Sequence, residues 1–233
     1  MIGKGKSISH GVAALEYDLA KEINGQAVAT EIARHELYGC TGAEMVQEMK
    51  PYHIDFPNVK NNCLRFEVSP SIEESATFTD ADWAELGNDF MQRMGLANHQ
   101  YIIIRHSGTE SKKEQAHLHI LANRVSLSGE LYRDNWIGKK ATEAANAIAK
   151  ERNFVQSQDI GKVNKAEIKE AMDGVLKKMQ GFDFTKFKEE LGKRGFKVRE
   201  ARASTGKLNG YYVTARSGTE YKASEIGKGY TLA

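Results

Sequence analysis

The chain has 233 residues, 40% hydrophobic and 27% charged, a composition typical of a globular protein that argues against a disordered chain. No apolar run approaches the ~20 residues that a membrane span needs, and no apolar core follows Met1 as it would in a signal peptide. The two cysteines suit a reducing cytoplasm. The net charge of +2 is the sum of an acidic part and a basic part. Residues 1–137 contain 13 Lys and Arg against 19 Asp and Glu, whereas residues 138–233 contain 20 Lys and Arg against 12 Asp and Glu. The basic part is compatible with a polyanionic partner.

Residues 1–137 carry signals for three helices and three strands. Apolar residues at helical spacing predict helices over residues 10–22, 43–49 and 80–94. Ser9 is expected to cap the first of these helices, and a turn is expected at Asn24-Gly25. Alternating or continuous apolar runs predict strands over residues 63–69, 101–106 and 115–125.

Two of these strands are expected to present a polar face opposite an apolar one. In the first strand, apolar residues alternate with Arg65 and Glu67. In the third strand, the even positions are apolar and the odd positions include His117 and His119. Because alternate residues of a strand share a face, we expect both polar rows to line an open side of a sheet.

Residues 138–233 begin with helices and end with strand signals. The helices are predicted over residues 139–151, 164–179 and 185–193, and Asn164 is expected to cap the second of them. Strands are predicted over 196–203 and 211–215, around a turn at Asn209-Gly210. A glycine-rich segment over 217–230 is expected to form an irregular strand pair.

The mixed order of these elements predicts an α+β fold, because antiparallel hairpin signals alternate with helices without a repeating βαβ rhythm. We expect a central antiparallel sheet that carries the histidines, with helices packed mainly on one face. We also expect a single domain over residues 1–233, in which residues 138–195 form a mainly helical segment.

Three of the seven histidines fall close together in the sequence, at His106, His117 and His119. A hairpin between the second and third strands would bring His106 beside the other two. A single strand histidine is usually a surface or core residue with a hydrogen-bond partner, but three that converge can hold a divalent metal ion with positions left open for substrate. The spacing therefore favours a metal site over three unrelated histidines.

Two further residues are candidates for chemistry. Glu67 can orient a ligand imidazole or accept a proton, and an exposed strand carboxylate without a role fits its position equally well. Tyr17 lies on the flank of the first helix, and from the spacing alone it is best interpreted as a partly buried helix tyrosine.

The histidine segment resembles the three-histidine motif of relaxases, the mobilisation nucleases of conjugative and mobilisable elements. The matching residues are His106-Ser-Gly-Thr followed by Ala116-His117-Leu118-His119-Ile120-Leu121-Ala122-Asn123. Residues 3–10, which lead into the helix with Tyr17, are similar to the family's first motif. Residues 64–70 with 94–95 and residues 210–230 are similar to its middle segment and its end, so the resemblance covers nearly the whole chain.

This resemblance implies a fold, an activity and a set of roles. Relaxases of this type have an α+β domain that cuts one DNA strand at an origin of transfer and stays joined to the 5′ phosphate through a tyrosine. Carried over to this sequence, Tyr17 is the nucleophile, and His106, His117 and His119 hold a divalent ion, Mg²⁺ or Mn²⁺. Glu67 is near the family's acidic position, and His10 is a minor rival to Tyr17 and an alternative base.

The sequence also departs from the family's pattern. The spacing from His106 to His117 is longer than usual, with residues 111–114 as the expected extra residues. An acidic residue commonly follows the first histidine closely, and here Gly108 or Thr109 stands in that place.

The expected partner is single-stranded DNA at an origin of transfer and the adjoining duplex, together with accessory mobilisation proteins and a coupling protein in a bacterial cytoplasm. The expected DNA contacts are Lys4, Lys6, Arg65, Asn123, Arg124, Lys222 and Lys228. Tyr211, Tyr212, Tyr221 and Tyr230 either stack on unpaired bases or pack in a core.

Three alternatives remain open. One is a non-catalytic DNA-binding module with a histidine metal site. Another is a nicking endonuclease of the replication-initiator type, which generally has its tyrosine after the histidine motif, whereas Tyr17 lies before it. Longer relaxases carry further C-terminal domains, so this sequence can also be a trimmed form of such a protein.

Overall fold

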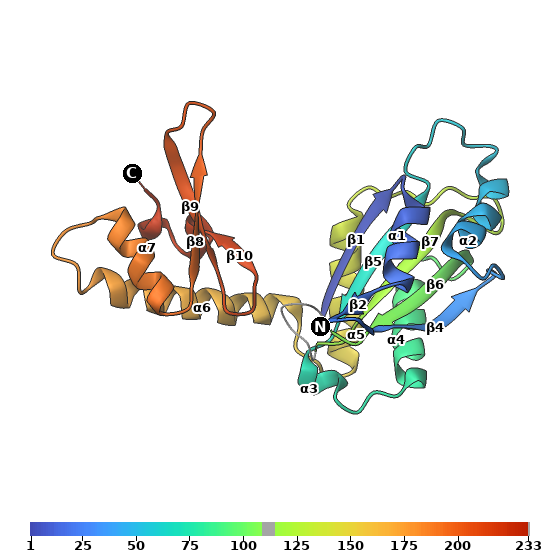
Figure 1. Cartoon of the computed structure of the whole chain (residues 1–233), viewed down its shortest axis with the longest axis horizontal. Coiled ribbons are helices and arrows are strands. Elements are labelled where there is room, and N and C mark those ends of the chain that lie inside the picture. Colours follow the sequence, from blue (N-terminus) through green and yellow to red (C-terminus); the bar gives the residue numbers. More distant parts are fainter. Residues whose placement is uncertain (109–114, 233) are drawn as a thin grey trace. The chain divides into compact units, whose positions relative to one another are not determined.

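A computed structural model describes residues 1–108 and 115–232, and these divide into two compact units, Met1–Ser157 and Gln158–Ala233. Figure 1 labels the helices and strands of both, and each unit is considered by itself. A single nuclease domain over the whole chain stays a prediction, and the expected extra residues 111–114, with Thr109, lie outside the described part.

The larger unit is built on a five-stranded sheet in the order β1-β5-β7-β6-β4, with every neighbouring pair antiparallel. Its strands are β1 Ile2–Ile8, β4 Ala29–His35, β5 Cys63–Ser69, β6 His99–His106 and β7 His117–Ser126. The predicted α+β class and central antiparallel sheet are therefore confirmed, and the histidine strands β6 and β7 lie inside the sheet rather than at its edge.

Helices cover both faces of this sheet to different extents. The unit contains α1 Gly11–Leu19, α2 Gly42–Met49, η1 Lys50–His53, α3 Ile72–Ser75, α4 Asp80–Arg93, α5 Ile137–Glu151 and a small hairpin of β2 Glu22–Ile23 and β3 Gln26–Ala27. The two long helices α4 and α5 pack together on one face, as expected. In addition, α1 and α2 cover one end of the other face.

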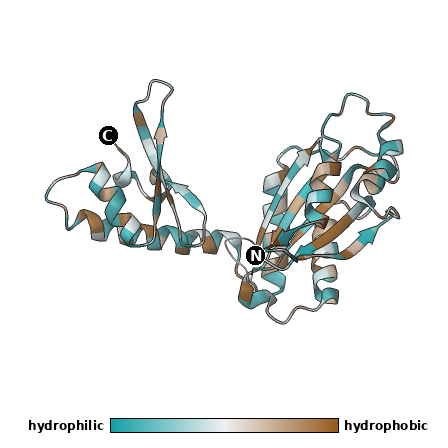
Figure 2. Cartoon of the chain, in the orientation of Figure 1, coloured by the Kyte–Doolittle hydropathy of each residue, from teal (hydrophilic) through white to brown (hydrophobic). Residues whose placement is uncertain are grey.

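The face under α4 and α5 is the main core. Leu64, Phe66 and Val68 of β5 are buried there beside Leu118 and Ile120 of β7, which confirms the predicted alternation in both strands. Each such side chain contributes ~1.5–3 kcal/mol to folding by leaving water. Figure 2 shows the hydrophobic residues gathered on the central strands.

The sequence reading missed β1, the edge strand, because glycines are unfavourable inside strands. Gly3 and Gly5 face α5, and a side chain on Gly3 would collide with the carbonyl oxygen of Ala141. A Cβ on Gly5 would lie 2.8 Å from the Phe66 ring. The glycines let α5 approach the strand, and the alternation places Lys4 and Lys6 on the opposite face.

Other predictions in the first unit need correction. β4 was also missed, because its residues Ala29–His35 lack a clean alternation. The first helix begins after His10, with no side-chain cap, and ends at Leu19, so the predicted Ser9 cap is wrong. The expected turn at Asn24-Gly25 is confirmed between β2 and β3, where both residues have positive φ.

The smaller unit has its own sheet and core. Its elements are α6 Ser157–Leu176, α7 Phe184–Lys193, β8 Lys197–Arg202, β9 Leu208–Thr214, β10 Glu220–Lys222, α8 Ala223–Ile226 and η2 Lys228–Tyr230. The three strands are antiparallel in the order β10-β9-β8. A buried cluster that includes Ile168, Phe187 and Val213 joins the helices to one face of this sheet.

Three local predictions in this unit are wrong. Residues 217–230 do not form a strand pair, because they contain one strand, β10, which pairs with β9, and then the helical turns α8 and η2. Asn164 does not cap a helix but lies buried inside α6, where its side-chain amide donates a hydrogen bond of 3.1 Å to the Tyr221 hydroxyl. The hairpin turn is not at Asn209-Gly210, which belong to β9; it lies between β8 and β9, where Gly206 has φ +82°. Among the described residues, no helix has the length and apolar character needed to cross a membrane.

Candidate functional site

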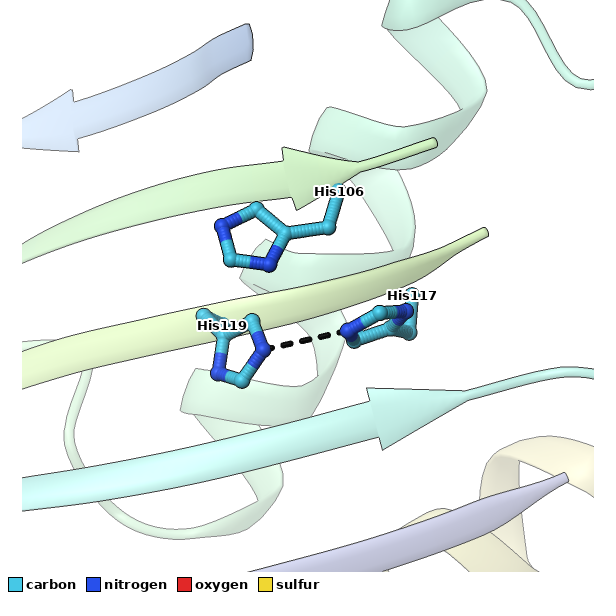
Figure 3. Close-up of side chains that lie close together, drawn as sticks. All are labelled: His106, His117 and His119. Atoms are coloured by element: carbon cyan, nitrogen blue, oxygen red, sulfur yellow. Dashed lines mark hydrogen bonds between the residues drawn. The ribbon is translucent and has the colours of Figure 1, made fainter. Parts of the chain in front are cut away.

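The three histidines predicted from the sequence converge on one face of the larger sheet. His106 at the end of β6 pairs directly with His117 at the start of β7, and His119 follows on the same face. Figure 3 shows the three rings turned toward one another, with one ligand atom from each within 4.8 Å of the others. The Nε2 atoms of His117 and His119 are 3.1 Å apart. The predicted hairpin juxtaposition is confirmed.

In two of the rings, one nitrogen donates a hydrogen bond to a backbone carbonyl oxygen. His106 Nε2 donates to the carbonyl of Asp18 at 2.7 Å, and His117 Nδ1 donates to the carbonyl of Gln115 at 3.2 Å. Because a carbonyl oxygen only accepts, the second nitrogen of each ring keeps its lone pair. Metal-binding histidines commonly have such a second partner, which fixes the tautomer and the orientation of the ring.

This donor set fits a metal ion. Two nitrogens each ~2.1 Å from one ion lie ~3.0–3.4 Å apart at octahedral to tetrahedral angles, a range that includes the 3.1 Å between His117 and His119. His106 completes a set of three, which leaves further coordination positions for substrate or water. All three are imidazoles, which suit transition-metal ions better than Mg²⁺.

Burial favours the neutral form of two of these imidazoles, His106 and His119. It lowers the pKa of His106, and it lowers the pKa of His119 to about 2, with the neighbouring histidines, Arg65 and Lys4 as further causes. A neutral imidazole is the form that binds a metal. His106 and His119 are therefore in their metal-binding protonation state at neutral pH.

Asp18, on α1, is a site residue that the sequence reading missed. Its side chain is 2% exposed and accepts two hydrogen bonds from Arg65, one of them 3.1 Å long from Nε. One carboxylate oxygen is also 3.8 Å from Nδ1 of His119. Burial raises the pKa of Asp18, and the Arg65 guanidinium opposes that rise.

A signal for Asp18 was present in the sequence. The buried stripe of α1 consists of Gly11, Ala14, Leu15 and Asp18, so a carboxylate occupies a position with apolar spacing. A buried carboxylate needs a cationic or hydrogen-bonding partner, which marks such a position as a candidate site.

Glu67 lies beside the cluster. It pairs with His119 across β5 and β7, and its carboxylate accepts a hydrogen bond of 3.0 Å from Nζ of Lys4. Lys4, Lys6, Arg65, Glu67 and His119 line a hollow of about 220 Å³ on this face, with Gly5 and Phe66. The structure thus places three predicted DNA-contact residues and the candidate base next to one histidine.

Tyr17 is on α1, one residue before Asp18, and is 56% exposed. Its hydroxyl accepts a hydrogen bond of 2.7 Å from Nζ of Lys21, which also lies over the ring. Within residues 1–108 and 115–232, no hydrogen bond or ring contact joins Tyr17 to the histidines. His10 is exposed at the start of the same helix.

Two predicted DNA contacts are structural instead. Asn123 is fully buried, and its Oδ1 accepts hydrogen bonds from Nε2 of His53 at 2.6 Å and from the backbone of Val125 at 3.0 Å. Arg124 donates to the carbonyls of Tyr132 and Asn61 and forms an ion pair of 2.6 Å with Asp134. Asn123 is thus closed off from solvent, and each of the three side-chain nitrogens of Arg124 has a partner within the protein.

The other two predicted contacts, Lys222 and Lys228, are exposed in the smaller unit. Of the two interpretations of the aromatic residues, core packing fits Tyr211, and stacking on a base fits the position of Tyr212 better. Tyr211 is buried in the core of that unit, whereas Tyr212, on the opposite side of the same strand, lies half-buried beside Arg199 and Lys222.

A family model described as "Relaxase: MobA/VirD2-like, nuclease domain" matches residues 17–154. Two solved structures of the conjugative relaxase TrwC in complex with oriT DNA are also similar. The metal-bound structure has 11% sequence identity and a TM-score of 0.39, and the metal-free structure has 10% identity and a TM-score of 0.40. Both alignments cover 89% of this chain and 74% of the TrwC chain. No curated protein matches the chain significantly.

Proposed function

Because the chain belongs to the family of MobA/VirD2-like relaxase nuclease domains, we propose that it nicks one strand of DNA at an origin of transfer and stays covalently attached to the cut end. The observation that supports this activity most directly is the three-histidine cluster. It lies beside Lys4 and Lys6, which are cations suited to hold a DNA phosphate next to the histidines.

The proposed reaction is a transesterification. The phenol oxygen of Tyr17 attacks phosphorus, an O–P bond to the tyrosine forms, and the bond from phosphorus to the 3′ oxygen breaks. The tyrosine proton passes to a base, for which Glu67 and His10 are the candidates, and the departing 3′ oxygen takes up a proton as a hydroxyl. The ester bond is exchanged rather than hydrolysed, so the reaction can be reversed after transfer.

The protein's own residues would prepare this step. His106, His117 and His119 would hold a divalent ion, which supplies positive charge to the phosphate oxygens in the transition state. Lys4 and Lys6 would bind the strand, and the Arg65–Asp18 pair would position His119. Lys21, at 2.7 Å from the Tyr17 hydroxyl, is placed to stabilise negative charge on that oxygen.

For the metal itself, an all-imidazole donor set favours Mn²⁺ over Mg²⁺, because Mg²⁺ prefers oxygen ligands. We further propose single-stranded DNA with its adjoining duplex as the substrate. Accessory mobilisation proteins and a coupling protein remain predicted partners.

A labelled single-stranded origin oligonucleotide tests the proposal. Incubated with Mn²⁺ or Mg²⁺, the wild type should give an adduct that survives SDS, and Tyr17→Phe should give none. His117→Ala combined with His119→Ala should lose both metal binding and cutting. Tyr52→Phe, which changes another tyrosine of the same unit, is the matched control and should form the adduct normally.

One specific observation supports a second candidate, a non-catalytic DNA-binding module with a histidine metal site. The Tyr17 hydroxyl is bonded to Lys21 and has no described contact with the histidines. Metal-dependent DNA binding without any adduct would establish this candidate and reject the relaxase activity.

A further inference from the structure

We propose that the three-stranded sheet of the smaller unit carries a second DNA-binding face, centred on Arg199, Tyr212 and Lys222. The inference rests on the proposed function in one respect, that DNA is the partner. The face lies in residues 158–233, beyond the residues 17–154 that the family model matches.

The strand register places these three residues in one row. Arg199 of β8 pairs with Tyr212 of β9, and Tyr212 pairs with Lys222 of β10. Directly paired residues project from the same face of a sheet. The next row, Val198, Val213 and Tyr221, projects from the other face and belongs to the core cluster of this unit. The Arg199–Tyr212–Lys222 row is therefore turned away from the core.

Within the row, the cations are arranged around the ring. The guanidinium carbon of Arg199 is 4.1 Å from the centroid of Tyr212, and Nζ of Lys222 is 5.8 Å from it. Arg199 also forms an ion pair with Glu220, with bonds of 2.8 and 2.6 Å. The ring contact holds the guanidinium over Tyr212, where it can exchange the Glu220 carboxylate for a phosphate oxygen while the tyrosine contacts a base.

A hollow beside Tyr212 gives room for a base. Ala201 and Gly210 pair across β8 and β9 on the same face, so the sheet surface is low at this point. Together with Tyr212, Lys222 and Ser224, they contribute to the lining of a hollow of about 370 Å³, which Tyr211, Ala223 and Leu232 of the core cluster also line. An aromatic wall and a nearby cation are the features with which proteins bind unpaired bases.

The charge of the unit fits a polyanion. Residues 158–233 contain 16 Lys and Arg against 10 Asp and Glu, whereas residues 1–157 contain 17 against 21. The positive charge of the chain thus belongs to the smaller unit. A phosphate backbone supplies the complementary charge, and its binding releases counterions and depends on salt.

Fluorescence anisotropy with the full chain tests the proposal, in EDTA so that no strand is cut. Arg199→Gln combined with Lys222→Gln should weaken binding of a single-stranded oligonucleotide at least fivefold. The slope of log K against log salt concentration should also become less negative by ~1.4, since each lost phosphate contact on single-stranded DNA changes it by ~0.7. The matched control is Lys177→Gln, just after α6, combined with Lys186→Gln on α7. It makes the same charge change and should retain affinity.

Two single variants sharpen the test. Glu220→Gln removes a carboxylate that competes for Arg199, so it should tighten binding, a result that general damage would not give. Tyr212→Leu should weaken binding of single-stranded DNA about fivefold or more and weaken binding of duplex less, because only unpaired bases are free to stack. Unchanged thermal melting curves would verify that each variant folds.

The proposal is overturned if the Arg199 and Lys222 double variant binds both DNAs like the wild type, or if the control pair weakens binding equally. Covalent adduct formation with Mn²⁺ is measured separately on the same proteins. A wild type that forms no adduct rejects the proposed nicking activity and leaves the anisotropy comparison intact, so the two failures are distinguishable.

Discussion

Arg65 on β5 and Asp18 on α1 form a two-bonded ion pair behind His119, with Nη2 of Arg65 3.4 Å and Oδ1 of Asp18 3.8 Å from the Nδ1 atom of that ring. The pair joins the helix that carries Tyr17 to the sheet that carries the histidines. It therefore connects the position of the candidate nucleophile with the orientation of a metal ligand.

Asp18→Asn should weaken Mn²⁺ binding about 10- to 100-fold, because the substitution removes the charge that orients His119. It should also lower the free energy of unfolding by ~1–3 kcal/mol, since Arg65 loses a buried partner. Isothermal titration and urea unfolding measure the two effects. Unchanged metal affinity in a folded Asp18→Asn protein would show that the pair is purely structural.

The metal-free protein should lose stability as the pH falls below about 6.5. Burial lowers the pKa of His106 and His119 in the folded state, so the unfolded chain takes up protons first when the pH drops. Stability from these groups is complete above the unfolded pKa of about 6.5 and decreases below it, by ~1.4 kcal/mol for His119 at pH 5.5.

Urea unfolding between pH 7.5 and 5.5 in EDTA measures this dependence. His119→Gln, which stays neutral throughout, should flatten the pH profile. A profile as steep in His119→Gln as in the wild type would contradict the prediction for this residue.

Gly5→Val should destabilise the larger unit by ~1–3 kcal/mol or more, because the new side chain meets the Phe66 ring and α5. Lys6→Val, on the next residue and the opposite face, is the matched control. It should change stability by less than about 0.5 kcal/mol and reduce DNA affinity instead. Equal stability losses in the two variants would mean that the faces of β1 are assigned wrongly.

Asn123→Ala should cost ~2–4 kcal/mol of stability, because it leaves His53 and Gln100 without a buried hydrogen-bond partner. DNA affinity measured below the melting transition should remain at the wild-type level. Asn58→Ala on an exposed loop serves as the control for stability. A stable Asn123→Ala protein with weakened DNA binding would restore the residue to the DNA interface.

The histidine cluster was predictable because it depends on local rules. Period-two alternation in β7 puts His117 and His119 on one face, and the antiparallel pairing of β6 with β7 brings His106 beside them. The role of Asn123 was not predictable in this way. It shares the face of His119, but α2 and η1 cover its end of the strand, and only long-range packing determines which end is covered.

The strands β1 and β4 show a second limit. Glycine is unfavourable in an isolated strand, and the reason for Gly3 and Gly5 is α5, which lies more than 130 residues away in sequence. β4 contains a register shift between Glu31 and Ala33, so its residues do not keep a simple alternation. Both strands therefore depend on contacts with segments that are distant in the sequence, and the local pattern of residues does not reveal those contacts.

The alternation of glycine and lysine along β1 also has a consequence for strand pairing. If β1 slipped by one residue against β5, the lysines would turn into α5 and the glycines would turn toward the histidines. One such slip would damage the core and at the same time remove two cations from the face of the sheet that carries the three histidines. A misregistered chain would therefore be unstable, so the tight approach of α5 ensures that stable molecules present both lysines on the face of the histidine cluster.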